Sequence, residues 1–339
     1  MRTRTRPLLI AAVSAAALLL AACGKPAASG GGAAAGSMSM TIGYTAIGAA
    51  YDDLYVCQDQ GVFAKNGLTV KLTLLNSSSQ LFAALASNSV QIGVGVAQST
   101  AAGALNGVPL KYVALPIPHY YVEMWGKSTL TSSAADLKGK KIGLSSPGSL
   151  GDASIDAWLA EQGLTDKDIK KTFLKSTPAE VTALEKGAVD AIVTQPPTGT
   201  QTRAKGFKKI MDFTRFPAAA NAYTVKADYD TTNSKAVAAF VKSEVECLSI
   251  LHNDEKTAIA SIIKHSGNDD PTLAKYSYDF FNPLWARTPT VDPGLLTKAF
   301  QAAAQDKGLD PPANADQYVD NSYVDALQKQ GYIDSLYRD

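Results

Sequence analysis

The sequence predicts an α/β protein of two lobes, each with a mostly parallel sheet flanked by helices, and a helical C-terminal tail that covers one of them. Three observations predict it: short apolar strands alternate with helices from residue 41, the alternation restarts near residue 140, and the chain becomes mainly helical after residue 230. The restarts imply two extended hinge crossings, expected near Tyr121–Trp125 and Ala222–Lys226. A protein built in this way binds its ligand between the lobes, at the carboxyl ends of the strands.

The first α/β unit is recognised by its hydrophobic periodicity and its helix stops. Leu68, Val70, Leu72 and Leu74 alternate with other residues, which predicts a half-buried strand. Gly61 ends the helical stretch before it. The expected elements are strands at 41–44, 68–75, 90–96 and 112–117, and helices at 49–60, 80–86 and 99–105.

The second unit repeats the pattern, and the tail follows it. Gly163 and Gly187 each follow a helical stretch, and Pro196 and Pro197 end a strand. The second unit is expected to hold strands at 140–144, 171–174, 189–194, 208–213 and 222–225, and helices at 151–161, 178–186 and from 198. Tail helices are expected at 234–252, 255–265, 271–282, 293–307 and 319–330. Lobe one is therefore assigned residues 40–122 and 224–339, and lobe two residues 123–223.

The composition is that of a folded protein with little net charge. Hydrophobic residues make up 46% of the 339 residues and charged residues 19%, with a formal net charge of +1. Removing Arg2, Arg4 and Arg6 with the leader takes that charge from +1 to −2. These values exclude a disordered chain, a rod and a disulfide-dense scaffold, and no nucleic-acid partner is expected. The cysteines and histidines show no metal-ligand spacing, so no metal and no cofactor are expected.

Residues 1–22 are predicted to be a lipoprotein signal peptide. Three arginines precede an apolar run from Leu8 to Ala22 that is short for a permanent membrane span. The run Leu20-Ala21-Ala22-Cys23 resembles the lipobox of bacterial lipoproteins, in which the cysteine is acylated. An ordinary signal peptide with a chance cysteine is the alternative. Residues 23–39, rich in Gly, Ala and Ser, are then the lipid anchor and a flexible tether, and the exported body is expected to face the periplasm or cell exterior as a monomer.

With Cys23 assigned to lipid, Cys57 and Cys247 form an even pair in an oxidising compartment. Cys57 falls in the first helix of lobe one, and Cys247 falls in the first tail helix, which is expected to pack on that lobe. The pair is a candidate disulfide, and two buried free thiols are the alternative.

Four segments between residues 42 and 191 carry a family resemblance through their order and spacing. They are Ile42-Gly43-Tyr44 with Gln60-Gly61-Val62-Phe63-Ala64-Lys65-Asn66-Gly67-Leu68, then residues 83–93 (AALASNSVQIG), 135–143 (ADLKGKKIG) and 185–191 (EKGAVDA). Together they resemble the nitrate, sulfonate, taurine and thiamine-pyrimidine class of ABC-importer substrate-binding proteins. Asn88 and Gln91 depart from the Gly and Asp that this class often has in the second segment.

The resemblance implies a bilobal type II periplasmic-binding fold, with two mixed sheets flanked by helices, two hinge crossings and the helical C-terminal tail packed on lobe one. It also implies a non-enzymatic function. A protein of this class captures a small organic or inorganic solute, of the nitrate, sulfonate or taurine type, and delivers it to an ABC permease with its ATPase subunits. The alternative is a binding protein for a pyrimidine or another aromatic heterocycle. An enzyme on the same fold is a third reading, and no nucleophile–base spacing in the sequence favours it.

Candidate ligand-binding residues lie at predicted strand ends, where helices begin. Helix N-termini offer free N–H groups and a positive dipole end, which suit anions. For the serines the alternative is simple N-capping; for the tyrosines it is the core, and for the amide an exposed loop. The candidates are Tyr44, Ser77, Ser78, Ser79, Gly95 and Ser99 in lobe one, Tyr120 at the first crossing, and Ser145, Gly148, Ser149 and Gln195 in lobe two.

Overall fold

The structure, a computed structural model, describes residues 38–75 and 77–337. Its first sheet, called sheet A, has the strand order β2-β1-β3-β10-β4. β1 runs parallel to β2 and β3, whereas β10 is antiparallel to both β3 and β4. The strands are β1 (Met38–Tyr44), β2 (Leu68–Leu74), β3 (Ile92–Gly95), β4 (Leu110–His119) and β10 (Pro217–Lys226).

The second sheet, called sheet B, has the order β7-β6-β8-β5-β9. β6 is parallel to β7 and β8, and β5 is antiparallel to β8 and β9. The strands are β5 (Glu123–Lys127), β6 (Lys141–Leu144), β7 (Lys170–Phe173), β8 (Ala191–Thr194) and β9 (Phe207–Asp212). The prediction of two mixed sheets flanked by helices is therefore confirmed.

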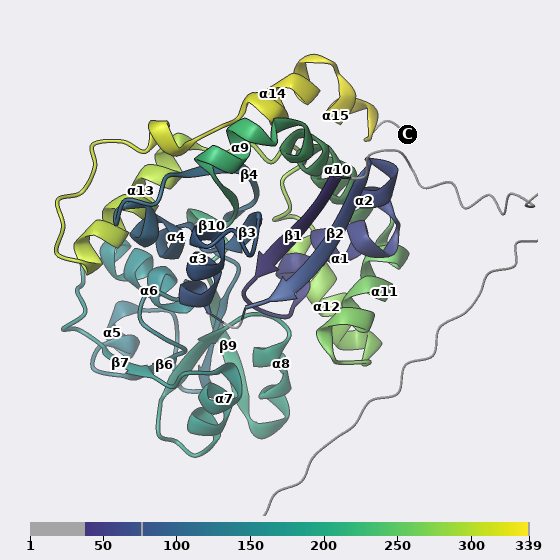
Figure 1. The fold of residues 1–339 in the computed structure, drawn as a ribbon. Coiled ribbons are helices and arrows are strands. Elements are labelled where there is room, and N and C mark those ends of the chain that lie inside the picture. The colour runs from purple at the N-terminus through teal and green to yellow at the C-terminus, as the bar shows by residue number, and fades with distance from the viewer. Residues whose placement is uncertain (1–37, 76, 338–339) are drawn as a thin grey trace, which may run out of the picture. The chain divides into compact units, whose positions relative to one another are not determined.

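Helices connect the strands within each sheet (Figure 1). Side-chain caps begin several of them; Ser77 caps α3 and Ser149 caps α6, each by accepting a backbone N–H three residues on. Beside sheet A the helices are η1 (Ala49–Tyr51), α1 (Asp52–Asp59), α2 (Val62–Lys65), α3 (Ser78–Ala86) and α4 (Ala97–Ala104). Beside sheet B they are α5 (Ala134–Leu137), α6 (Leu150–Glu161), α7 (Thr177–Glu185), α8 (Thr198–Gln201) and η2 (Arg203–Lys205).

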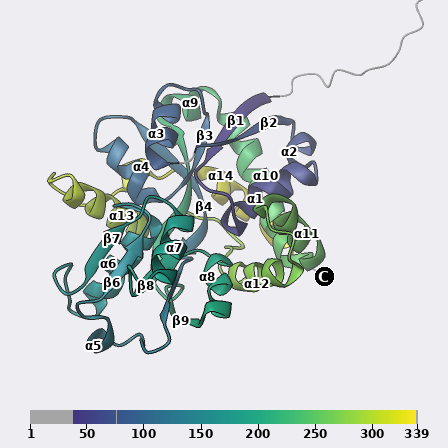
Figure 2. The same cartoon turned by 90° about the horizontal axis from the view of Figure 1, so that it is seen from below.

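The tail helices pack on sheet A and its helices. α10 contacts α1, β2 and β4, and α13 contacts α4 and β10 (Figures 1 and 2). Within the described part of the chain, no helix combines the length and apolarity needed to cross a bilayer. The tail comprises α9 (Ala227–Thr232), α10 (Ser234–Asn253), α11 (Glu255–Ser266), α12 (Pro271–Phe281), α13 (Pro293–Asp306), η3 (Asp316–Tyr318), α14 (Ser322–Lys329) and α15 (Tyr332–Ser335).

Two crossings join the sheets and run side by side. The chain leaves sheet A after His119 and enters sheet B at Glu123, and it returns between Asp212 and Pro217. The crossings are hydrogen-bonded to one another: the Tyr120 N–H donates to the Phe216 carbonyl at 3.1 Å, and the Phe213 N–H donates to the Val122 carbonyl at 3.1 Å. The hinge is therefore a two-stranded antiparallel ribbon.

The second crossing was predicted at Ala222–Lys226, and this is wrong. Those residues lie in the middle of sheet A, where β10 pairs with β3 and β4. The strand starts at Pro217, and its first residues, Ala218-Ala219-Ala220, have none of the β-branched or aromatic residues that mark a strand in sequence. Pairing with β4 makes them a strand, so only the tertiary structure sets this boundary.

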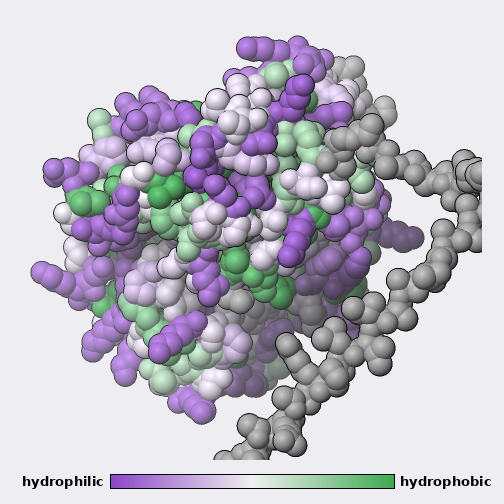
Figure 3. Space-filling view, viewed as in Figure 1, coloured by the Kyte–Doolittle hydropathy of each residue, from purple (hydrophilic) through white to green (hydrophobic). Residues whose placement is uncertain are grey.

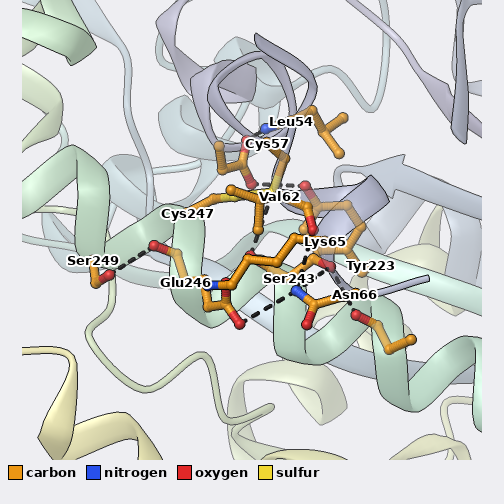
Figure 4. Close-up of a disulfide and its surroundings, with 12 residues drawn as sticks. Leu54, Cys57, Val62, Lys65, Asn66, Tyr223, Ser243, Glu246, Cys247 and Ser249 are labelled. Carbon is orange, nitrogen blue, oxygen red and sulfur yellow. Dashed lines mark hydrogen bonds and ion pairs between the residues drawn. A yellow bond between two sulfur atoms is a disulfide. The ribbon is translucent and has the colours of Figure 1, made fainter. Parts of the chain in front are cut away.

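A disulfide ties the tail helix α10 to α1. Cys57 of α1 and Cys247 of α10 are joined with their Cα atoms 5.5 Å apart, and both are fully buried (Figure 4). Beside it, the Asn66 amide donates to the Ser243 hydroxyl at 3.1 Å, and Lys65 is ion-paired with Glu246 at 2.9 Å (Figure 4). The structure thus contains the bond between the candidate cysteines.

Candidate functional site

The candidate site lies where loops that follow strands of sheet A meet loops that follow strands of sheet B. The loop after β1 is Thr45-Ala46-Ile47-Gly48, and α4 begins directly after β3. In sheet B the turn 145–149 follows β6, and Gln195-Pro196-Pro197 follows β8. None of these loops carries a charged side chain. A solute held here would therefore meet backbone groups, hydroxyls and amides.

Ser99 and Gly148 connect the two sheets' loops directly. The Ser99 hydroxyl, in the first turns of α4, donates to the Gly148 carbonyl at 3.5 Å. Gly148 has a φ of +68°, a left-handed conformation that glycine adopts without the penalty of a side chain. Two of the sequence-predicted residues are thus brought together by the fold, although they lie 49 positions apart in the chain.

Asp152 holds the turn that contains Gly148, and sequence reasoning missed it. Its carboxylate accepts the Gly148 N–H at 2.9 Å, while its own N–H donates to the Ser149 hydroxyl at 3.3 Å. This reciprocal arrangement resembles a capping box, with an acidic residue three positions after a serine N-cap. The spacing Ser149-Leu150-Gly151-Asp152 was therefore a signal that could have found it.

Lys171 of β7 forms an ion pair with Asp152. Its ammonium group contacts Asp152 at 2.8 Å and Asp166 at 2.8 Å, and it is also ion-paired with Asp156. Burial acts to lower the pKa of Lys171, but the hydrogen bonds that its ammonium donates to the three carboxylates outweigh this effect and raise the pKa. Burial raises the pKa of Asp156 to about 6 despite the lysine. One half-buried cation thus fixes α6, β7 and the 145–149 turn relative to one another.

Gln195 of the loop after β8 lies against the loop after β1, and Tyr44 is the last residue of β1. A Cβ added to Gly48, in the loop after β1, would lie 3.6 Å from the Gln195 side-chain oxygen, so the loops of the two sheets approach closely here as well. The half-buried Tyr44 ring packs against Tyr51 and Tyr55, with ring centroids 5.6 and 5.8 Å away. The isoleucine of the loop after β1, Ile47, is 54% exposed and adds an apolar side chain at this edge.

The other predicted residues occupy less direct positions. Ser77 accepts the Gln80 N–H at 3.2 Å, which is the bond of an N-cap, and Ser78 and Ser79 form the first turn of α3. The Ser145 carbonyl accepts the Lys175 N–H at 2.7 Å. Gly95 ends β3 beside the Thr45 hydroxyl, which would lie 3.6 Å from an added Cβ. The Ser77 contact is local, whereas the Ser145 contact joins the turn after β6 to the loop after β7; the role of both serines in ligand binding stays a prediction.

Tyr120 lines a groove next to this junction. The groove has a volume of about 810 Å³ and lies between α6 of one sheet, α13 of the other and the crossings that join them. Burial raises the pKa of the Tyr120 hydroxyl to about 12. Pro217, Ala218 and Ala219 of β10 also line the groove. A volume in this range suits a small organic molecule.

Two five-stranded mixed sheets joined by two crossings define the α/β fold of periplasmic binding proteins, and comparison with solved structures agrees. The alkanesulfonate-binding protein SsuA from Xanthomonas axonopodis pv. citri superimposes with a TM-score of 0.68 at 20% identity, covering 84% of this chain and 98% of that one. The periplasmic nitrate-binding protein NrtA from Synechocystis PCC 6803 gives a TM-score of 0.64 at 17% identity and covers 85% of each chain. At these identities the likeness establishes the fold.

The sequence itself matches the family model described as "NMT1/THI5 like" over residues 51–258. The chain therefore belongs to the NMT1/THI5-like family. A curated relative, 4-amino-5-hydroxymethyl-2-methylpyrimidine phosphate synthase from Uromyces fabae, is 30% identical over 140 residues. That match covers 41% of this chain and 40% of the relative, so it spans well under half of either protein.

In the described residues, no group of three or more His, Cys, Asp or Glu side chains is arranged to hold a metal ion.

Proposed function

We propose that the chain is an extracytoplasmic substrate-binding lipoprotein of an ABC importer, which captures a small solute between its two sheets. The observation that carries this proposal is the junction of uncharged polar loops from both sheets, with Ser99 donating to Gly148 across it. Because the sheets are joined by two narrow crossings, a solute that contacts both sets of loops favours the closed arrangement. The sulfonate- and nitrate-binding proteins that share the fold support this reading.

A second candidate solute is a pyrimidine or a related aromatic heterocycle. The curated relative is named for the synthesis of a pyrimidine phosphate, and two aromatic rings are available for stacking: Tyr44 at the end of β1 and Tyr120 in the lining of the groove. Both candidate solute classes can be held without a charged partner. A sulfonate would use helix N-termini and hydroxyls, and a heterocycle would use ring stacking and amides.

A thermal-shift screen distinguishes the two classes. Taurine, a short alkanesulfonate, nitrate and 4-amino-5-hydroxymethyl-2-methylpyrimidine are added separately to the mature chain. A solute present at 100 times its Kd stabilises the folded form by about 2.7 kcal/mol, which appears as a clear rise in Tm. We expect one class to give this rise. A flat response to all four contradicts solute capture as proposed.

Variants of the junction test where the solute binds. Ser99→Ala and Gln195→Ala each remove one neutral hydrogen-bonding group, which we expect to weaken binding by about two- to tenfold. Calorimetry with the solute found in the screen measures this change. The control is Ser87→Ala, which lies at the exposed end of α3 and donates to Ala84. If both junction variants bind as tightly as the control, the solute binds elsewhere.

The proposed lipid anchor is tested at Cys23, which lies outside the described residues. Cys23→Ala removes the thiol that the lipobox reading acylates, so we expect the protein to move from the membrane pellet to the soluble fraction. Ser29→Ala, in the same tether, is the control and should leave the protein in the pellet. A Cys23→Ala protein that stays with the membranes would contradict lipid attachment at this residue.

A further inference from the structure

Glu123 is a fully buried carboxylate at the point where the chain enters sheet B. One of its oxygens accepts the Trp125 indole N–H at 2.9 Å. The other accepts the Lys209 ammonium at 3.0 Å and the Tyr276 hydroxyl at 2.6 Å. A buried charge is stable only when it is paired and hydrogen-bonded, and these three donors provide that pairing. Lys209 belongs to β9 of the same sheet, whereas Tyr276 belongs to α12 of the tail.

α12 is anchored to the part of the molecule that surrounds sheet A. The Tyr278 hydroxyl donates to the Leu251 carbonyl of α10 at 3.2 Å. The Phe281 ring packs against Tyr121 of the first crossing with centroids 5.6 Å apart, and the helix also contacts η1 and α11. The hydrogen bond from Tyr276 to Glu123 therefore links the sheet-A body to the first residue of sheet B.

We propose that the Tyr276–Glu123 hydrogen bond is a third, releasable tie between the two sheets that restrains bending at the crossings. Glu123 directly follows the first crossing, and its partner in the β5–β9 pairing, Asp212, directly precedes the second. The bond thus fastens the sheet-B end of both crossings to α12. The two oxygens are 2.6 Å apart, so a shift of about one ångström at Glu123 separates them beyond about 3.5 Å, where an O–H···O bond is lost.

The surroundings of the Tyr276–Glu123 hydrogen bond allow it to break at a moderate cost. Tyr276 is half-buried. The charged groups that act on its hydroxyl are Glu123, Asp212 and the Arg203 guanidinium. When the hydroxyl leaves, Glu123 keeps the bonds from Trp125 and Lys209, so the buried charge is never left alone. Release therefore costs one hydrogen bond rather than a whole buried ion pair.

Hydrogen–deuterium exchange on the mature chain without added solute tests the tie, so its outcome is independent of the proposed solute capture. The reporters are the crossing amides of Tyr120 and Phe213, which bond the two crossings together. Tyr276→Phe removes only the hydroxyl that Glu123 accepts, and we expect these amides to exchange about tenfold faster, the effect of losing one hydrogen bond to a charged group. Glu123→Gln should accelerate the same amides.

Tyr278→Phe is the matched control, because it removes a hydroxyl from the same helix whose bond stays within the tail. It should leave the crossing amides unchanged. Amides inside β1 and β6 report global opening, and they should not change in any of the variants. If Tyr276→Phe leaves the crossing amides as slow as Tyr278→Phe does, or accelerates the sheet interiors equally, the bond does not restrain the hinge and the proposal is wrong.

Discussion

Replacing Cys57 and Cys247 together by alanine will lower the free energy of unfolding by about 5 kcal/mol, the loop-entropy value for a cross-link of this length. The two cysteines are 190 positions apart, so the disulfide closes most of the folded chain into one loop. Without it the unfolded chain gains the conformational freedom that the cross-link removes. Urea unfolding of the double variant, compared with the oxidised wild type, measures the loss.

Reduction provides an independent control for this prediction. The wild-type protein treated with a strong reductant should unfold at nearly the same urea concentration as the double variant. Any small difference between the two midpoints comes from the cavity that the alanines leave. The alanine variant itself should not respond to the reductant. Equal stability of the oxidised wild type and the double variant would show that the disulfide does not stabilise this fold.

Glu244→Gln will make the protein less sensitive to alkaline pH. Glu244 and Asp53 are buried together beside the disulfide; the Tyr223 hydroxyl donates to Asp53 at 2.7 Å, and neither Glu244 oxygen has a hydrogen-bond donor. Burial raises the pKa of Glu244 well above its ordinary range, and the Asp53 charge raises it further. Glu244 is therefore the protonated, neutral member of this carboxyl pair. Asp53 is the ionised member, and the Tyr223 hydroxyl stabilises its charge.

The sign of the pH dependence follows from the raised pKa. The folded protein keeps a proton on Glu244 that the unfolded chain releases, so the stabilisation is complete below the unfolded pKa and is lost as pH rises through the folded pKa. One proton corresponds to about 1.4 kcal/mol per pH unit within that window. Urea unfolding from about pH 5 to about pH 9 should show a shallower decline for Glu244→Gln. The decline should not vanish, because burial also raises the pKa of Asp52.

Glu246→Gln, two residues along the same helix, is the matched control with the opposite sign. Burial acts to raise the pKa of Glu246, but Lys65, Tyr332 and Asn66 donate to it and lower the pKa overall. Its contribution is present above the unfolded pKa and is lost as pH falls, so this variant should lose stability at neutral pH. A Glu244→Gln profile that parallels the wild type throughout would contradict a protonated Glu244.

The strand and helix order could be read from the sequence because its signals are local. The alternation Leu68, Val70, Leu72 and Leu74 marks β2, and stop signals such as Gly163 mark helix ends within a few residues of where the structure has them. One strand escaped this reading. β5 is a short segment with Glu123 and Lys127 at its ends and Gly126 inside, and it is a strand because β8 and β9 pair with it on both sides.

The candidate site was predictable as a set of positions but not as a set of contacts. Ser99, Gly148 and Gln195 were identified because each follows a predicted strand, and parallel strands bring their carboxyl ends to one edge. The partners that hold these positions are distant in sequence: Lys171 lies 19 positions after Asp152, and neither is marked by a motif that names the other. Nothing near Glu123 in the sequence points to Tyr276, 153 positions away.

By itself the sequence determined the class of fold, the order of its strands except β5, a candidate cysteine pair and the absence of charge in the loops of the candidate site. Those properties depend on side-chain periodicity, caps and composition, which act within a few residues. The tertiary structure alone decided where the chain returns to sheet A, which hydroxyl meets which carbonyl between the sheets, and how Glu123 and Glu244 differ although both are buried. These depend on which distant groups burial brings within hydrogen-bond distance: Glu123 receives three donors, whereas Glu244 receives none and keeps its proton.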